Sequence, residues 1–126
     1  MLTDDELLRY SRQILLPDID VAGQERLAAA TVVIVGAGGL GNPAALYLAG
    51  AGLKKIVLAD GDTLETSNLQ RQIAFREAQQ GENKAQALAA QLSALNPATD
   101  IQAHEQFVDE AWLNSVLPQA TVVLDC

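Results

Sequence analysis

A glycine-rich turn in the first third of the chain has the spacing of a phosphate-binding loop. Residues 36–41 read GAGGLG, which matches GxGxxG, and they follow a β-branched run at 31–35 and precede a helix-forming segment. Such glycines permit a tight turn that brings backbone N–H groups and the positive end of a helix close to phosphate oxygens. Ordinary turns also have this spacing, so the surrounding strand and helix are what favour nucleotide binding. The candidate binding residues of this glycine turn are Gly36, Gly38, Gly39 and Gly41.

A single acid ends the next apolar run. Residues 56–59 predict a second strand, and Asp60 follows them. The dinucleotide-binding fingerprint has an acid at about this place, where it accepts hydrogen bonds from ribose hydroxyls. The alternative is a turn residue at a strand end, and the upstream glycines favour the ribose role. NAD and ATP both contain a ribose, so Asp60 does not distinguish them.

The polar segment that begins at Asp60 favours ATP over NAD as the ligand. It covers residues 60–72, where a compact α/β unit normally has a short loop, and long loops usually carry function. Together with a downstream lysine it supplies an acid, an amide and two cations, which suit a triphosphate with Mg²⁺ and are not needed for hydride transfer. We therefore predict ATP and Mg²⁺ as ligands, contacted by Asp62, Asn68, Arg71 and Lys84.

Lys84 has two interpretations. It lies at the start of a predicted helix, where a cation opposes the helix dipole by about 0.3–1 kcal/mol unless an anion is bound nearby. The alternative is a solvated lysine whose charge is offset by Glu82. We favour the phosphate-binding role.

Four other residues have structural interpretations when only their sequence context is considered. Arg12 is a surface cation near the margin of an apolar helical stripe. His104 has no Cys, Asp or Glu at ligand spacing, so no metal ion held by protein ligands alone is predicted. Trp112 is predicted to be a packing anchor, and Cys126 is predicted to be a small core residue at the end of a buried strand.

Hydrophobic periodicity predicts the scaffold that positions these residues. A capping box and an apolar stripe predict a helix over residues 4–15, and a short helix follows over 24–30. Residues 1–30 are therefore predicted to be an N-terminal helical segment. Residues 31–126 are predicted to be an ATP-binding domain.

Strands and helices alternate in the predicted domain. Continuous apolar runs indicate strands buried on both faces, and an alternating run indicates an edge strand. This order predicts an α/β fold, a Rossmann-like open, mainly parallel sheet with helices on both faces and strand order 3-2-1-4. The predicted strands are residues 31–35, 56–59, 101–108 and 121–125. Of the three helices between them, the first is predicted to end near Gly50, the second to end at Asn96, and the third to begin at Asp109.

Composition and charge exclude several classes of partner. Apolar residues make up 49% and charged residues 19% of the 126, an ordinary balance for one globular domain. The net charge of -8 repels nucleic-acid backbones and anionic lipid. The acidic start and the lack of an apolar run of about 18 residues predict a cytoplasmic protein without a membrane span.

Four segments together carry a family resemblance. They are RYSRQIL at 9–15, VGAGGLG at 35–41, SNLQRQ at 67–72 and VLDC at 123–126. With them the chain resembles the ThiF/MoeB/HesA branch of the ubiquitin-activating-enzyme superfamily over its whole length. The resemblance implies an ATP-dependent adenylyltransferase that activates the C-terminal Gly-Gly carboxylate of a ubiquitin-like sulfur-carrier protein as an acyl adenylate. The product would serve sulfur transfer in thiamine or molybdopterin biosynthesis.

The resemblance also implies roles for individual residues. Gly39 and its neighbours would pack against ATP, and Asp60 would hold the ribose. Arg12 gains a functional interpretation, because such enzymes supply this arginine across a homodimer to the partner's ATP. The residues implied to handle the phosphates are Asn68, Arg71 and Lys84, with Asp62 beside the same site.

Members of this family have features that the chain lacks. They continue with an aspartate that binds Mg²⁺ shortly after the position of Cys126, with paired CxxC motifs for structural Zn²⁺, and with a downstream thiol. We therefore expect the chain to be the N-terminal half of such an enzyme, unable by itself to complete adenylation, with Zn²⁺ only in a full-length form. Residues 121–125 would then be a bare apolar edge that is prone to pairing.

Two other functions are compatible with part of the pattern. An NAD-dependent oxidoreductase domain fits the glycine turn and Asp60 but not the polar segment or Arg12. A non-catalytic nucleotide-binding or dimerisation fragment fits all the motifs. Binding of NADH without ATP would favour the first, and ATP binding without carrier binding would favour the second.

Overall fold

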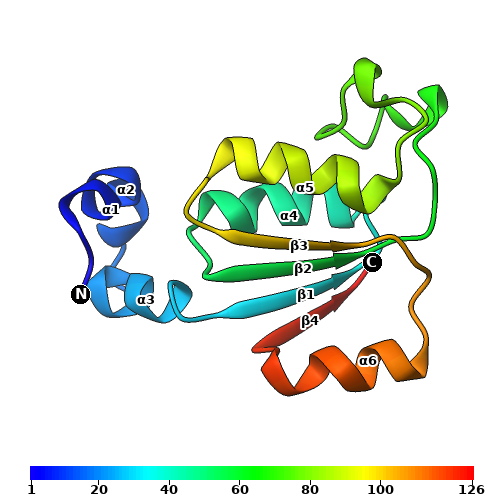
Figure 1. The fold of residues 1–126 in the computed structure, drawn as a ribbon. Helices are drawn as coiled ribbons and strands as arrows, with labels where there is room; N and C mark the ends of the chain where they lie inside the picture. Colours follow the sequence, from blue (N-terminus) through cyan, green and yellow to red (C-terminus); the bar gives the residue numbers. More distant parts are fainter.

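The computed structural model describes residues 1–126, and its centre is a parallel four-stranded sheet in the order β3-β2-β1-β4 (Figure 1). In the sheet register, Val33 lies opposite Val57 on one side and Val123 on the other. Because the strands are parallel, their carboxyl ends meet at one edge. The predicted Rossmann-like fold and strand order are confirmed. The strands are β1 (Thr31–Val35), β2 (Lys55–Ala59), β3 (Asp100–His104) and β4 (Val122–Asp125).

Helices cover both faces of the sheet, as predicted. α4 (Gly41–Gly50) and α5 (Lys84–Leu95) lie on one face, and α6 (Glu110–Val116) lies on the other (Figure 1). Each helix connects two parallel strands and therefore runs back from the carboxyl edge of the sheet toward its amino edge. The first residues of α4 and α5 consequently lie at the carboxyl edge.

Alternate residues of the two central strands fill two apolar cores. Ile34 and Ile56 are fully buried in the larger core with the helices α4 and α5. Val33 and Val57, also fully buried, pack on the opposite face in the core that contains Trp112 of α6. Burial on both faces explains why β1 and β2 show no polar alternation. The prediction of Trp112 as a packing residue is confirmed.

The single helix predicted over residues 4–15 is wrong, because the chain turns at Tyr10 between α1 (Asp4–Arg9) and α2 (Ser11–Ile14). Tyr10 has φ −103° and ψ 13° and is buried. Its hydroxyl accepts a 2.8 Å hydrogen bond from Asn96 Nδ2. This partner is 86 positions away in the sequence, so the local pattern does not contain the cause of the break.

The next helix, α3 (Asp20–Leu27), begins earlier than the predicted helix over residues 24–30. Gln24, near its middle, is fully buried, and its Nε2 donates a 2.9 Å hydrogen bond to the Ala51 carbonyl oxygen. A pattern of periodic apolar residues does not include a buried polar residue such as Gln24, which explains why the predicted start of α3 is too late. The first three helices lie beyond the amino ends of the strands (Figure 1). None of the six α-helices combines the length and hydropathy of a membrane span.

Three predictions at the sheet edges are wrong. β3 ends at His104 and does not continue to residue 108, so that Phe107 is exposed. β4 is largely exposed and not buried on both faces, with Val122 at 48% exposure, which confirms instead the expectation of a bare apolar edge. Cys126 is likewise exposed and is not a core residue. The common reason is that β3 and β4 are the outer strands, and β4 pairs with β1 alone.

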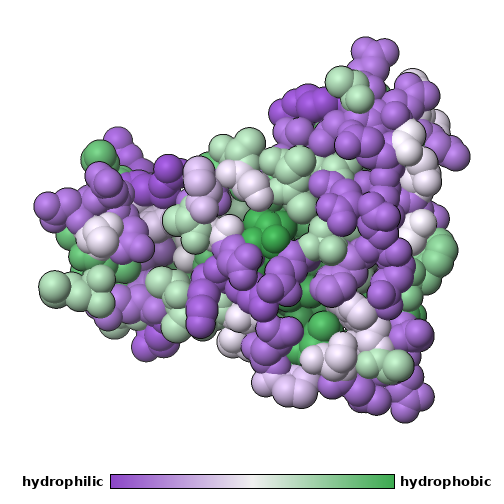
Figure 2. Space-filling model, in the orientation of Figure 1, coloured by the Kyte–Doolittle hydropathy of each residue, from purple (hydrophilic) through white to green (hydrophobic).

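The connection from β2 to α5, residues 60–83, is called the crossover segment below. It contains two 3-10 turns, η1 (Thr66–Asn68) and η2 (Glu77–Gln79), and it extends from the carboxyl edge of the sheet (Figure 1). Buried Leu64 and Phe75 anchor it to the core. Figure 2 shows a mainly hydrophilic surface at the upper right, where this segment lies.

Candidate nucleotide site

Two of the four glycines determine the shape of the glycine turn. Gly36 has φ +96°, which side chains rarely adopt, and a Cβ there would lie 3.0 Å from the backbone of Cys126. A Cβ at Gly41 would lie 1.9 Å from the Gly36 carbonyl oxygen. Gly39, in contrast, has nothing within 4 Å of its would-be Cβ. Two glycines therefore close the turn, and its outer side leaves the backbone open to a ligand.

The Asp60 carboxylate joins the glycine turn to the crossover segment. Its Oδ2 accepts a 2.8 Å hydrogen bond from the Ala37 N–H, and its Oδ1 accepts a 2.8 Å hydrogen bond from the Asp62 N–H. Each carboxylate oxygen can accept a further hydrogen bond. Asp60 can therefore hold the turn in place and still accept hydrogen bonds from ribose hydroxyls.

Asn83, which has no role in the sequence-based predictions, fixes the start of α5 at the same edge. Its Nδ2 donates to the carbonyl oxygens of Asp60 at 2.8 Å and Asp62 at 3.3 Å. Its Oδ1 caps α5 by accepting a 3.1 Å hydrogen bond from the Gln86 N–H. An asparagine before a helix is a recognisable cap signal. Its contacts with the end of β2 are visible only in the structure.

Lys84 is buried at the first position of α5. Its backbone N–H donates a 2.9 Å hydrogen bond to the Asp62 carbonyl oxygen. The residue is 8% exposed, and no carboxylate oxygen lies within 4.0 Å of its ammonium nitrogen. Most of the Lys84 side chain is therefore buried, and the ion pair with Glu82 that the alternative interpretation needs is absent. The dipole of α5 disfavours a cation at this position, and an anion bound nearby relieves that penalty.

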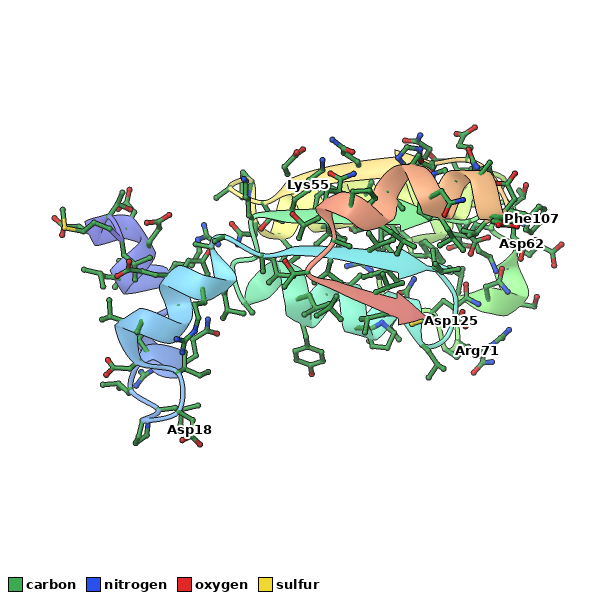
Figure 3. The ribbon with its side chains drawn as sticks, turned by 90° about the horizontal axis from the view of Figure 1, so that it is seen from below. Asp18, Lys55, Asp62, Arg71, Phe107 and Asp125 are labelled. Carbon is green, nitrogen blue, oxygen red and sulfur yellow. The ribbon has the colours of Figure 1, made fainter.

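The end of η1 supplies an amide and a second cation. Asn68 is buried, and its Oδ1 accepts a 2.9 Å hydrogen bond from the Glu65 N–H, whereas its Nδ2 has no protein acceptor. Arg71 is exposed, with Nη1 donating at 3.2 Å to the Ser67 carbonyl oxygen. Figure 3 shows Arg71 and Asp62 at the same end of the molecule. The structure thus brings Asn68, Arg71 and Lys84 to the edge that holds the glycine turn.

Arg12 lies away from this edge. The neighbouring Gln13 donates a 3.0 Å hydrogen bond from Nε2 to the carbonyl oxygen of Ala51, immediately after α4. The ten residues of α4 begin at the glycine turn and span about 15 Å, which is farther than an arginine side chain extends. The structure therefore does not bring Arg12 to the glycine turn of its own chain.

Asn42 is a second residue that sequence reasoning missed. It is fully buried below the glycine turn, where its Nδ2 donates a 3.3 Å hydrogen bond to the Ala37 carbonyl oxygen. Its Oδ1 accepts a 2.6 Å hydrogen bond from the Ala74 N–H in the crossover segment. In the sequence, the only sign that Asn42 links the glycine turn to the crossover segment is its polar amide among the apolar residues that begin α4.

The donor set fits a magnesium ion that arrives with a triphosphate. Mg²⁺ in such sites takes one or two protein carboxylates, and phosphates and water complete its ligands. The Asp62 carboxylate is exposed at the sheet edge and accepts no hydrogen bond from the protein. No group of three His, Cys, Asp or Glu side chains forms a metal cage. The protein therefore offers part of a magnesium shell.

The surroundings of Cys126 do not favour its thiolate form. Desolvation, and after it the neighbouring Asp125 carboxylate, raises the pKa of Cys126 above its ordinary value. The thiolate is the reactive form of cysteine, so a raised pKa leaves little of it at neutral pH. The chemistry of this edge therefore depends on its cations, amides and carboxylates.

Comparison with known proteins shows which proteins the chain is similar to. The ThiF family model matches residues 10–126. The adenylyltransferase and sulfurtransferase MOCS3 of Mus musculus is 51% identical over 125 residues, which are 99% of this chain and 27% of that protein. The sulfur carrier protein ThiS adenylyltransferase of Escherichia coli K12 is 47% identical over 125 residues, which are 99% of this chain and 50% of that protein.

A solved structure shows the same fold. The crystal structure of E. coli MccB with ATP matches with a TM-score of 0.76 and 34% identity, over 86% of this chain and 33% of that one. The chain therefore spans half or less of each of these three proteins.

Proposed function

The chain belongs to the ThiF family, and from this premise we propose that it is the ATP-binding part of an adenylyltransferase. Its substrate is the C-terminal Gly-Gly carboxylate of a ubiquitin-like sulfur-carrier protein, activated for sulfur transfer in thiamine or molybdopterin biosynthesis. The main supporting observation is the buried Lys84, which lies at the edge that holds the glycine turn and has no carboxylate partner. The E. coli relative's name, a ThiS adenylyltransferase, supports the substrate class.

The proposed reaction needs no general base. A carboxylate oxygen of the carrier attacks the α-phosphorus of ATP, the bond from that phosphorus to the bridging oxygen breaks, and pyrophosphate leaves. The products are an acyl adenylate and pyrophosphate. Because a carboxylate is already a nucleophile, the protein has to align the reactants and neutralise charge on the phosphate oxygens.

Each side chain at the edge has a proposed part in that task. Lys84 and Arg71 contribute positive charge to the phosphates, and the Asn68 Nδ2 contributes a neutral donor. Asp60 accepts hydrogen bonds from the ribose hydroxyls, and the N–H groups of the glycine turn face the phosphates. Mg²⁺, when bound, adds further charge neutralisation on the same oxygens.

The choice of nucleotide tests this proposal. We expect the 126-residue chain to bind ATP with Mg²⁺, and we expect NADH neither to bind nor to displace it, because the two cations complement a triphosphate. Isothermal titration calorimetry with each nucleotide measures this. Binding of NADH without ATP would instead indicate an oxidoreductase domain. ATP binding in a protein that never binds a carrier would indicate a non-catalytic nucleotide-binding fragment.

We further propose that the functional unit is a homodimer in which each copy supplies Arg12 to its partner's ATP. Arg12 is exposed on α2 and lies far from the glycine turn of its own chain. Leu15 and Leu16, immediately beyond α2, are also exposed. Exposed apolar side chains beside a cation suit a surface that a second copy covers.

Mixing two variants tests the exchange of Arg12. We expect Arg12→Ala and Arg71→Ala each to lack high-affinity ATP sites, because each variant removes one of the cations from every site. After subunit exchange in an equimolar mixture, about half of the dimers contain one copy of each variant, and each of these has one intact site out of two. About a quarter of the wild-type number of high-affinity sites should therefore return. Calorimetric stoichiometry counts these sites. An arginine that acts within its own chain predicts no recovery.

A further inference from the structure

A glutamine of the crossover segment has an amide with no partner in the protein. Gln72 is 3% exposed, and its backbone N–H donates a 2.9 Å hydrogen bond to the Asn68 carbonyl oxygen. Its side-chain Oε1 is completely buried without a hydrogen-bond donor. Its Nε2 likewise has no protein acceptor within hydrogen-bonding distance. The carbonyl oxygen of the amide is therefore buried and unpaired, and the amino group is unpaired at a place that solvent reaches.

Folding does not explain an amide in this state. Buried side-chain polar atoms nearly always have a partner, because leaving one unpaired forfeits the hydrogen bonds that water offered. Only three such atoms are unpaired in the whole chain, and they belong to Gln72, Thr99 and Trp112. Thr99 precedes β3 at the amino edge of the sheet, and Trp112 packs under α6. Gln72 is the one that lies at the candidate nucleotide site.

The position of Nε2 identifies the ligand group that would pair with it. Nε2 lies 3.6 Å from where a Cβ of Gly38 would be, so the amide faces the glycine turn. Phosphate oxygens are the acceptors that such a turn draws close. An N–H donor held in place by a buried residue and aimed at an anionic oxygen forms a strong hydrogen bond.

We propose that the Gln72 amide donates a hydrogen bond to the phosphate oxygen of ATP that lies against Gly38, which makes Gln72 a nucleotide-binding residue. This inference rests on the proposed function, since it requires ATP at the glycine turn. Gln72 then complements its neighbour Arg71: the exposed arginine approaches the phosphates from solvent, and the buried amide approaches them from within the protein.

Gln79 provides a matched control in the same segment. It is 9% exposed, and both ends of its amide are paired within the protein. Its Oε1 accepts a 3.0 Å hydrogen bond from the Arg76 N–H, and its Nε2 donates a 3.0 Å hydrogen bond to the Ala87 carbonyl oxygen. Gln79 is therefore a structural glutamine, and the two residues should respond in opposite ways to one substitution.

The test compares Gln72→Met with Gln79→Met by urea unfolding and by calorimetry with ATP and Mg²⁺. We expect Gln72→Met to keep or raise the urea midpoint and to weaken ATP binding about tenfold or more, as for a lost hydrogen bond to a charged group. We expect Gln79→Met to lower the midpoint and to bind ATP within a factor of about two, because its bonds stay inside the protein. Gln72→Glu, which places a carboxylate at the phosphate, should bind ATP no better than Gln72→Met.

Several results would overturn the inference. Wild-type ATP affinity in Gln72→Met would show that the amide makes no contact with the nucleotide. A lowered midpoint for Gln72→Met would assign it a structural role like that of Gln79. Equal weakening of adenosine and ATP binding would place the contact on the nucleoside instead of a phosphate. Absence of ATP binding in the wild type would refute the proposed function itself. Wild-type binding is therefore measured before that of any variant.

Discussion

Replacing Gly41 by alanine is expected to open the glycine turn and to weaken ATP binding about 100-fold. The added Cβ would lie 1.9 Å from the carbonyl oxygen of Gly36, a backbone atom. Because the blocking atom belongs to the backbone, relief of this contact requires the turn itself to shift. Overpacking of this kind destabilises by about 1–3 kcal/mol, occasionally more. A misplacement of about 1 Å can cost roughly 100-fold where groups must be positioned accurately, and we expect a loss of similar size in ATP affinity.

Gly39→Ala is the control for this prediction, since it adds the same methyl group to the same turn. Nothing lies within 4 Å of its Cβ position, so the free energy of unfolding should change by no more than about 0.5 kcal/mol. Urea unfolding separates the two variants by stability, and calorimetry with ATP and Mg²⁺ compares their affinities. Wild-type affinity in Gly41→Ala would show that the nucleotide does not depend on this turn.

The sequence predicts the centre of the fold better than its edges, and burial explains the difference. β1 and β2 are covered by helices on both faces, so their own residues carry the signal of a buried parallel strand. β4 has the same apolar composition but is exposed, because exposure depends on what lies beside a strand. The break at Tyr10 likewise depends on Asn96, which no local window contains.

The candidate site divides in a similar way. The glycine turn and Asp60 follow from spacing, because their backbone requirements leave a pattern in the sequence. The burial of Lys84 does not follow, since most lysines are exposed and only the packed crossover segment desolvates this one. The unpaired amide of Gln72 is also invisible in the sequence, where it resembles the fully paired Gln79.

Replacing Lys84 by methionine is expected to stabilise the protein while weakening ATP binding. Lys84 is 8% exposed as a whole residue, lies at the start of α5, and has no carboxylate oxygen within 4.0 Å of its ammonium nitrogen. Methionine fills a similar volume without a charge, so the free energy of unfolding should rise by about 1 kcal/mol. Loss of a charged donor to phosphate should raise the Kd for ATP by about 10-fold to 100-fold.

Lys55→Met separates this local effect from a general loss of positive charge. Lys55 begins β2 at the amino edge of the sheet, and its Nζ donates a 2.8 Å hydrogen bond to Gln119 Oε1. The substitution changes the net charge by the same amount, but it should leave ATP affinity unchanged because the site is at the other edge. A fall in stability for Lys84→Met with unchanged affinity would make Lys84 a structural residue. If Lys84 binds an anion, Lys84→Met should raise the free energy of unfolding and lower the affinity for ATP. The reason is that the protein alone leaves the charge of Lys84 without a partner.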